Sequence, residues 1–115
     1  MNEELSVQSI ESASLVLRAF GHPVRLKIID YLQDGKKSVG EIQRTLNLSQ
    51  PVTSQHLRYM YSKGILDYIQ TGTTYNYFIA NEFIQKIYDC VIDYQHKVQS
   101  GEWEMESMRS MLMEN

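Results

Sequence analysis

The residues whose types and spacing indicate recognition chemistry lie between Leu48 and Gly64. Read as a helix that turns by about 100° per residue, this stretch places hydroxyls, amides and one guanidinium on one face. Gln55 and Arg58 have the groups that pair with adenine and guanine in the major groove of DNA, and hydroxyls such as that of Ser54 bind phosphates or base edges. An ordinary solvated helix face has a similar composition, so the interpretation depends on the neighbouring elements.

The boundaries of this helix can be read from its residues. Ser49 is a good N-cap because its hydroxyl can accept from a free amide, and Pro51 falls in the first turn, where a missing N–H costs nothing. Gly64 suits the left-handed residue after the helix, and Ile65 beyond it can contact Met60, as in a Schellman motif. The apolar seam predicted to face the core consists of Thr53, Leu57 and Met60.

A second short helix is predicted immediately before the first. The residues Ser38-Val-Gly-Glu41 have the S-x-x-E pattern of a capping box, which starts a helix. Asn47 can end that helix in the left-handed conformation, so only Asn47 and Leu48 separate it from the cap at Ser49. Two short helices joined by so tight a turn, the second of them polar, predict a helix-turn-helix over residues 38–63.

After Gly64 the hydrophobic periodicity changes to that of a strand. Residues 65–70 and 74–79 are rich in β-branched and aromatic side chains, and Thr71-Gly72-Thr73 is predicted to be a three-residue hairpin loop. A hairpin over residues 65–79, directly after a helix-turn-helix, is the wing of a winged helix. Thr73 and Thr74 at its tip can contact phosphate, but they release no counterions, so we expect a shallow salt dependence of binding.

The outer segments leave apolar surface for packing outside the domain. Residues 5–20 form a helix with apolar side chains on more than one face, which is typical of a helix that packs outside its own domain. Pro23 opens the next helix, with Ile28 directed inward and Arg25 outward. Asn81 caps a long helix with an apolar stripe. A tail follows, with Trp103, Met105, Met108, Met111 and Leu112 at helical spacing. We therefore expect a mainly α fold with a β-hairpin: one winged helix-turn-helix domain over residues 1–115, with helical segments over 5–20 and 82–113 on either side of the helix-turn-helix and wing.

Composition narrows the class of protein. The chain has 115 residues, a net charge of −3 and a single cysteine, Cys90. Residues 18–63 carry eight Lys/Arg and three acids, so this part is +5 and the remainder −8. Positive charge around the polar helix is what phosphate binding requires. An acidic start without a signal-like apolar segment, and no apolar run of membrane-spanning length, predict a cytoplasmic protein without a membrane partner.

Three segments resemble the ArsR/SmtB family of winged-helix transcriptional repressors. They are Leu17-Arg-Ala-Phe-Gly-His-Pro-Val-Arg-Leu-Lys-Ile-Ile29, then Ser38-Val-Gly-Glu-Ile42, then Leu48-Ser-Gln-Pro-Val-Thr-Ser-Gln-His-Leu-Arg58 with Gly64-Ile-Leu66. The resemblance implies a homodimer joined through the first and last helices, residues 5–20 and 82–113, whose apolar side chains fit such an interface. It also implies a sequence-specific regulator that binds double-stranded DNA at an inverted-repeat operator. Carried over by position, the DNA-binding residues would be Ser49, Gln50, Pro51, Val52, Ser54, Gln55 and Arg58, to which we add Thr73 and Thr74 of the wing.

The chain departs from the family where sensing is concerned. The segment Lys37–Glu41 has no cysteine pair for a thiol metal site, and a lone Cys90 excludes a two-cysteine switch within one chain. Asp89, Asp93 and His96 share one face of the last helix and could supply zinc ligands. That face lies opposite the apolar stripe, however, and the family's second histidine is missing, so we expect no metal or other cofactor. The family's wing commonly carries Arg or Lys, which this tip lacks.

Two alternatives remain open from the residues alone. One is a winged helix that binds another protein and no DNA, which the acidic net charge and the wing without cations favour. The other is a zinc-sensing repressor that uses the last helix. No catalytic constellation or phosphate loop is visible, so an enzyme is not expected. His22 and His56 are expected to be local hydrogen-bonding residues, since neither has a matching partner nearby in the sequence.

Overall fold

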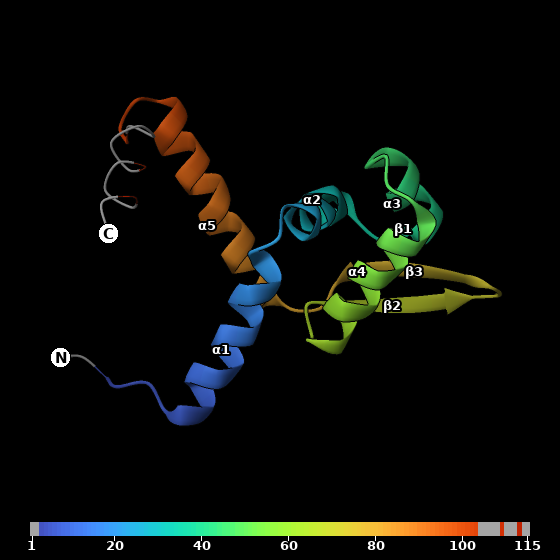
Figure 1. Ribbon diagram of the computed structural model, residues 1–115, viewed down its shortest axis with the longest axis horizontal. Coiled ribbons are helices and arrows are strands. Elements are labelled where there is room, and N and C mark those ends of the chain that lie inside the picture. The colour runs from blue at the N-terminus through green and yellow to red at the C-terminus, as the bar shows by residue number, and fades with distance from the viewer. Residues whose placement is uncertain (1–2, 104–108, 110–112, 114–115) are drawn as a thin grey trace. The chain divides into compact units, whose positions relative to one another are not determined.

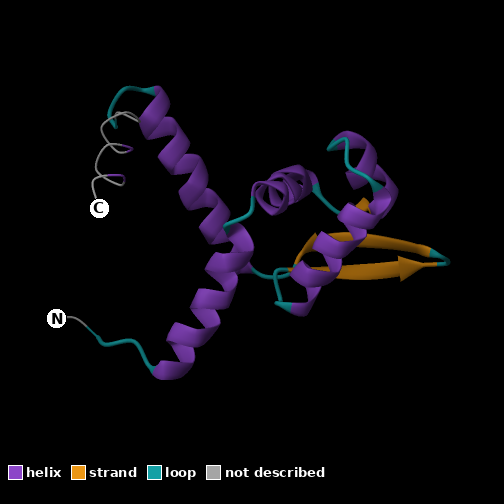
Figure 2. Cartoon of the chain, in the orientation of Figure 1, coloured by secondary structure: helices purple, strands orange, loops and turns teal. Residues whose placement is uncertain are grey.

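The computed structural model describes residues 3–103, 109 and 113 (Figure 1). The elements are α1 (Val7–Phe20), α2 (Pro23–Tyr31), the 3₁₀ turn η1 (Leu32–Asp34), β1 (Lys37–Ser38), α3 (Val39–Thr45), α4 (Gln50–Ser62), β2 (Leu66–Thr71), β3 (Thr74–Ile79) and α5 (Glu82–Gln99). Residues 1–84 and 85–115 form two compact units, and the helix-turn-helix and wing lie in the first. The predicted fold, helical with a hairpin after a helix-turn-helix, is confirmed (Figure 2).

The N-terminal caps agree with the local sequence. The Ser38 Oγ accepts from the Glu41 amide at 3.1 Å, and the Ser49 Oγ accepts from the Val52 amide at 3.3 Å. Asn81 precedes α5 and caps it, because its Oδ1 accepts from the Ile84 amide at 3.1 Å. His22 caps α2, because its Nδ1 accepts from the Val24 amide at 3.1 Å. Each cap satisfies an amide that has no partner within its helix.

The end of α4 is a complete Schellman motif. The Ile65 amide donates to the Met60 carbonyl at 2.9 Å, and the Gly64 amide donates to the Tyr61 carbonyl at 3.1 Å. Gly64 has a φ of 75°, the left-handed conformation predicted for it. Asn47 is likewise left-handed, with a φ of 54°, and it ends the turn between α3 and α4.

Replacing Gly64 with alanine should lower the free energy of unfolding by about 1–2 kcal/mol, because a side chain at positive φ contacts its own carbonyl. No described atom lies within 4 Å of the position that the new Cβ would take, apart from the neighbouring residues. The loss of stability therefore comes from the backbone conformation and not from a clash with other side chains. Urea unfolding measures it, and Gly64→Asn should lose less, since asparagine tolerates this conformation. Equal stability of Gly64→Ala and the original chain would contradict the assignment.

The sheet differs from the predicted two-stranded hairpin. It has three antiparallel strands in the order β1-β3-β2, with Lys37 paired with Tyr77 and Ser38 with Asn76. A two-residue strand has no periodicity of its own, so the sequence did not predict β1. The hairpin loop is also one residue shorter than predicted, because Thr71 pairs with Thr74 and only Gly72 and Thr73 connect the strands. Gly72 has a φ of 63°, which fits a type II′ turn.

The core of the first unit lies between α2, α3, α4 and the sheet. Its fully buried side chains include Ile28, Ile29, Ile42, Leu57, Met60, Ile65, Leu66, Ile84 and Thr53. The predicted seam of α4 is therefore confirmed, and the Thr53 hydroxyl is satisfied by donating to the Ser49 carbonyl at 2.8 Å. Arg25, predicted to point outward, is instead half-buried.

Helix α1 leaves most of its apolar surface exposed. Ala19 is its one buried residue, whereas Val7, Ile10 and Leu17 are 71%, 49% and 60% exposed. The expectation of apolar side chains beyond what the domain covers is confirmed for this helix. Of the predicted tail, residues 104–108 and 110–112, with Met105, Met108, Met111 and Leu112, lie outside the described residues. Within the described part of the chain, no helix combines the length and apolar character that crossing a membrane requires.

Candidate nucleic-acid interface

Helix α4 carries the predicted recognition residues on its outer side. Gln50, Pro51, Val52, Gln55 and Arg58 are exposed, whereas Ser54 is half-buried. The Gln50 Nε2 donates to the Ser54 Oγ at 2.8 Å, so these two side chains hold each other in place on the first turns of the helix. The hydroxyl of Ser49 is engaged as the cap, as described above, and its proton remains available to a phosphate oxygen.

A groove of about 770 Å³ separates α4 from the wing. Its lining comes from the start of α3, one side of α4 and the hairpin: Ser38, Val39, Gly40, Gln50, Ser54, Leu57, Arg58, Tyr61, Tyr68, Thr73, Thr74, Tyr75 and Tyr77. The structure therefore brings Gln50, Ser54 and Arg58 together with the wing threonines. Pro51, Val52 and Gln55 do not line the groove and lie elsewhere on the exposed surface of α4.

Four tyrosines form one wall of this groove. The ring centroid of Tyr68 lies 5.0 Å from that of Tyr61, 5.1 Å from that of Tyr75 and 5.4 Å from that of Tyr77. The hairpin tyrosines therefore pack against one another and against Tyr61 of α4. Tyr61 was not predicted to be a residue of the interface, although it lies one turn beyond Arg58 on the groove side of α4. Burial raises the pKa of Tyr77 above its ordinary value of 10.0.

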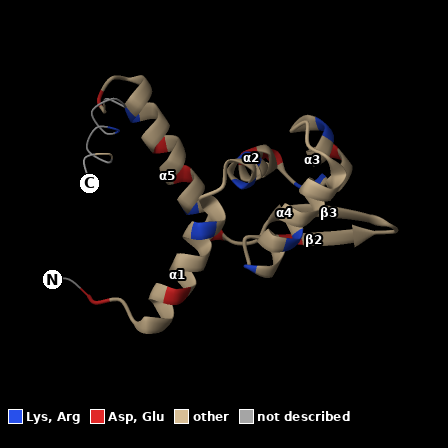
Figure 3. Cartoon of the chain, viewed as in Figure 1, with Lys and Arg blue, Asp and Glu red and all other residues tan. Residues whose placement is uncertain are grey.

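The positive charge lies on the helices and not on the wing. Figure 3 shows Lys and Arg on α2, α3 and α4, and none at the tip of the hairpin. Arg58 is exposed at the groove. The Arg44 guanidinium lies against Gly40, a residue of the groove lining: its Nη1 is 3.1 Å from where a Cβ at position 40 would be. At the loop before β1, the Lys37 Nζ is paired with the Asp34 Oδ1 at 3.1 Å.

On the other side of α4, the helix contacts the start of α2. The ring centroids of His22 and His56 are 4.6 Å apart, and the Cζ of Arg25 lies 4.0 Å from the ring centroid of Tyr59. No partner was predicted for either histidine, because the two residues are remote along the chain. Burial, followed by the nearby His22 and Arg25, lowers the pKa of His56 below its ordinary value of 6.5.

The lowered pKa of His56 makes stability depend on pH. The unfolded chain takes up a proton at this residue near pH 6.5, whereas the folded chain does so only at lower pH. Between the two values the unfolded state binds more protons, so the free energy of unfolding should fall as the pH drops below about 7. His56→Gln should show a smaller fall in urea unfolding, with His96→Gln on α5 as the control. An identical fall in His56→Gln would contradict this.

Two of the three candidate metal ligands of α5, Asp89 and Asp93, have other partners. The Asp93 Oδ2 pairs with the Lys97 Nζ at 3.5 Å, and the Asp89 Oδ1 accepts from the Gln85 Nε2 at 3.0 Å. Across the described residues, no three His, Cys, Asp or Glu side chains are grouped so that they could hold a metal ion. Cys90 is exposed on the same helix. Zinc sensing through Asp89, Asp93 and His96 thus gains no geometric support from the described residues.

Together, the tight turn between α3 and α4, the polar outer side of α4 and the adjoining hairpin define a winged helix-turn-helix, a class that binds DNA with its second helix. Residues 22–68 match the family described as "Bacterial regulatory protein, arsR family". The chain is 38% identical over 80 residues to the HTH-type transcriptional regulator YgaV of Escherichia coli, which is 69% of this chain and 81% of that protein.

Two solved structures extend the comparison. The transcriptional repressor PagR of Bacillus anthracis has a TM-score of 0.69 and 31% identity, over 75% of this chain and 99% of that one. The homodimeric winged helix-turn-helix DNA-binding domain Mb0332 of Mycobacterium bovis has a TM-score of 0.76 over 88% of this chain and 95% of that one; at 21% identity it supports the fold alone. The chain belongs to the ArsR family and is a DNA-binding transcriptional regulator.

Proposed function

We propose that this protein is a homodimeric repressor that inserts α4 of each protomer into the major groove of an inverted-repeat operator. The observation that carries the proposal is the row of exposed side chains on α4, with Gln55 and Arg58 at its centre and the threonine-tipped wing beside it. These groups match the edges of adenine and guanine and the phosphates next to them. The proposed activity is DNA binding without catalysis, in the cytoplasm, where the DNA lies.

The dimer is supported by the apolar surface of α1. Val7, Ile10 and Leu17 are large, exposed and apolar, and such patches on a small domain mark association surfaces. The M. bovis domain of similar fold is described as homodimeric. Two-fold symmetry would make the operator an inverted repeat, with half-sites about one helical turn (roughly 10 bp) or a multiple apart.

The repressor assignment rests on a relative and is open to direct test. PagR, at 31% identity, is described as a repressor. A protein bound at an operator that overlaps the promoter would block RNA polymerase. Deleting the protein would then raise transcription from that promoter. The start of α3 has no pair of thiols. We therefore do not propose a metal bound by thiols there as the signal that releases the DNA.

Selection from a pool of random duplexes tests the proposal, repeated with a panel of divalent metals and with a thiol oxidant. We expect an enriched inverted repeat, lost in Arg58→Glu and kept in Lys86→Glu, a matched charge reversal on α5. A metal or oxidant that shifts the affinity would identify the sensor. Failure to enrich any sequence at low salt would reject DNA reading and turn attention to a protein partner for α4.

A further inference from the structure

Arg25 is held in an unusual position for a cation. Its guanidinium carbon lies 4.0 Å from the ring centroid of Tyr59, which joins α2 to α4. Its Nε and Nη1 atoms are buried and have no hydrogen-bond partner among the described residues. Arg25 as a whole is half-buried, so part of its side chain remains accessible from outside. Unsatisfied N–H groups on a partly buried guanidinium are costly, so an anion that binds beside it would be stabilised.

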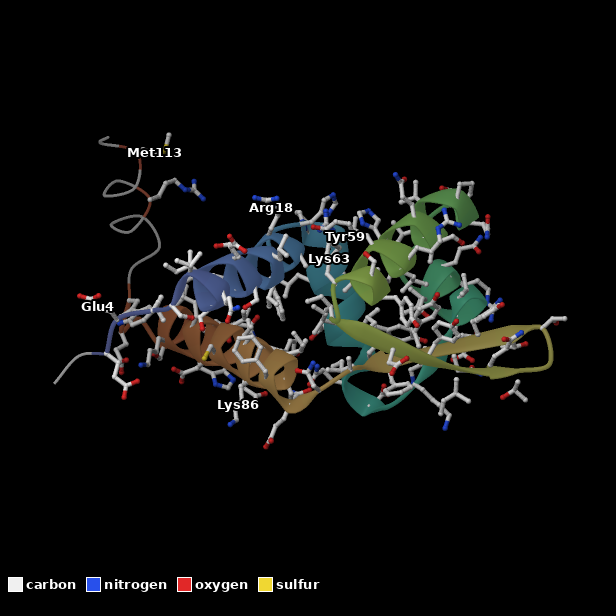
Figure 4. All side chains as sticks on the ribbon, turned by 90° about the horizontal axis from the view of Figure 1, so that it is seen from below. Glu4, Arg18, Tyr59, Lys63, Lys86 and Met113 are labelled. Carbon is white, nitrogen blue, oxygen red and sulfur yellow. The ribbon has the colours of Figure 1, made fainter. Side chains whose placement is uncertain are left out.

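A second cation shares the same ring. The Lys63 Nζ lies 5.7 Å from the ring centroid of Tyr59, and both side chains project from the C-terminal end of α4 (Figure 4). The ion pairs found among the described residues join Lys37 to Asp34 and Lys97 to Asp93, and neither involves Arg25 or Lys63. Two positive charges around one aromatic ring, neither of them in an ion pair with a carboxylate of the described residues, form a site for a negatively charged ligand.

This cluster, Arg25 with Tyr59 and Lys63, faces away from the wing. Measured around α4 from Arg58, Tyr59 and Lys63 lie at about +100° and +140°, whereas the groove residues Ser54 and Tyr61 lie at about −40° and −60°. A helix in the major groove has one sugar–phosphate backbone on each side of it. The wing side of α4 therefore faces one backbone, and the Arg25 cluster faces the other.

We propose that Arg25 and Lys63, positioned on the ring of Tyr59, bind the backbone phosphates of the DNA strand opposite the wing. The inference rests on the proposed insertion of α4 into the major groove. It divides the backbone contacts by chemistry, because the wing tip offers the hydroxyls and amides of Thr73 and Thr74, whereas the α2 side offers charge. The ionic part of binding, and with it most of the salt dependence, then comes from the α2 side.

The geometry suits a phosphate better than a carboxylate of another protein. A stacked guanidinium is planar and already ordered, so it loses little conformational freedom when it binds an oxyanion. Lys63 is exposed and supplies a second donor next to it. Phosphates recur along a DNA strand, so neighbouring oxyanions can meet both cations together.

The test is the salt dependence of operator binding. Lys63→Gln and Arg25→Gln should each lower the slope of log K against log[salt] by about 0.9, so that each variant loses roughly 3.5-fold less affinity than the original chain between about 50 and 200 mM salt. Lys27→Gln is the matched control, since Lys27 is an exposed cation about 200° further around α2 from Arg25. Thr73→Ala should weaken binding and leave the slope unchanged.

Phosphate mapping locates the contact. Neutral methylphosphonate linkages, placed one at a time, should weaken binding by the original chain at positions where Lys63→Gln and Arg25→Gln show no further loss. These positions should lie on the strand opposite the positions that lose their sensitivity in Thr73→Ala. Thermal unfolding checks that Arg25→Gln folds, and exposed Lys63 provides a variant that leaves the core intact. Operator binding with an unchanged slope in both variants overturns this inference, whereas absence of any operator overturns the proposed function instead.

Discussion

Arg58→Ala is expected to reduce operator affinity by about 1–3 kcal/mol, roughly 5- to 140-fold, with the loss concentrated at one base pair of each half-site. The guanidinium is exposed on α4 at the edge of the groove, and no ion pair holds it among the described residues. It is therefore available to pair with the N7 and O6 of guanine. Titration of the selected operator and of all its single-base variants, at one fixed salt concentration, measures the effect.

The position dependence distinguishes base reading from backbone contact. Arg58→Lys should restore part of the attraction but not the two-point hydrogen bonding, so preference at that base should stay relaxed. The free energy of unfolding should be nearly unchanged in Arg58→Ala, since an exposed side chain contributes little to it. A loss that is equal on every sequence, random duplex included, would assign Arg58 to the phosphates.

Leu57→Ala, one residue earlier on the same helix, should act through stability. Leu57 is fully buried in the seam that packs α4 onto the core, so removing its side chain leaves a cavity and should lower the free energy of unfolding by about 2–5 kcal/mol. Small domains have about 5–15 kcal/mol in total, so this variant should be partly unfolded near physiological temperature. Urea unfolding followed by circular dichroism, at one protein concentration, measures the loss.

Two comparisons make the Leu57 result specific. Leu57→Met keeps the volume and the apolar character, and it should cost less than about 1.5 kcal/mol. DNA binding by the folded fraction of Leu57→Ala should keep the base preference of the original chain, because the outer face of α4 is unchanged. A loss of stability below about 1 kcal/mol would mean that Leu57 is not part of the packed core.

The sequence alone determined the elements that depend on neighbouring residues. The caps at Ser38, Ser49 and Asn81 and the left-handed Gly64 follow from hydrogen bonds and backbone sterics within a few residues. The buried seam of α4 follows from helical periodicity. Because these are short-range effects, the helix-turn-helix and the polar face that includes Gln55 and Arg58 could be predicted from residue types in order.

Only the tertiary structure decided which remote residues meet. β1 exists because Lys37 and Ser38 reach an edge of β3, and two residues cannot indicate a strand by themselves. The rings of His22 and His56, and the stack of Arg25 on Tyr59, form where α2 crosses α4, which local patterns do not specify. Arg25 was predicted to point outward because a charged side chain usually remains in water, yet packing against an aromatic ring holds it half-buried. Interactions between neighbouring residues therefore define the recognition helix, and long-range packing determines which charged and aromatic side chains lie beside it.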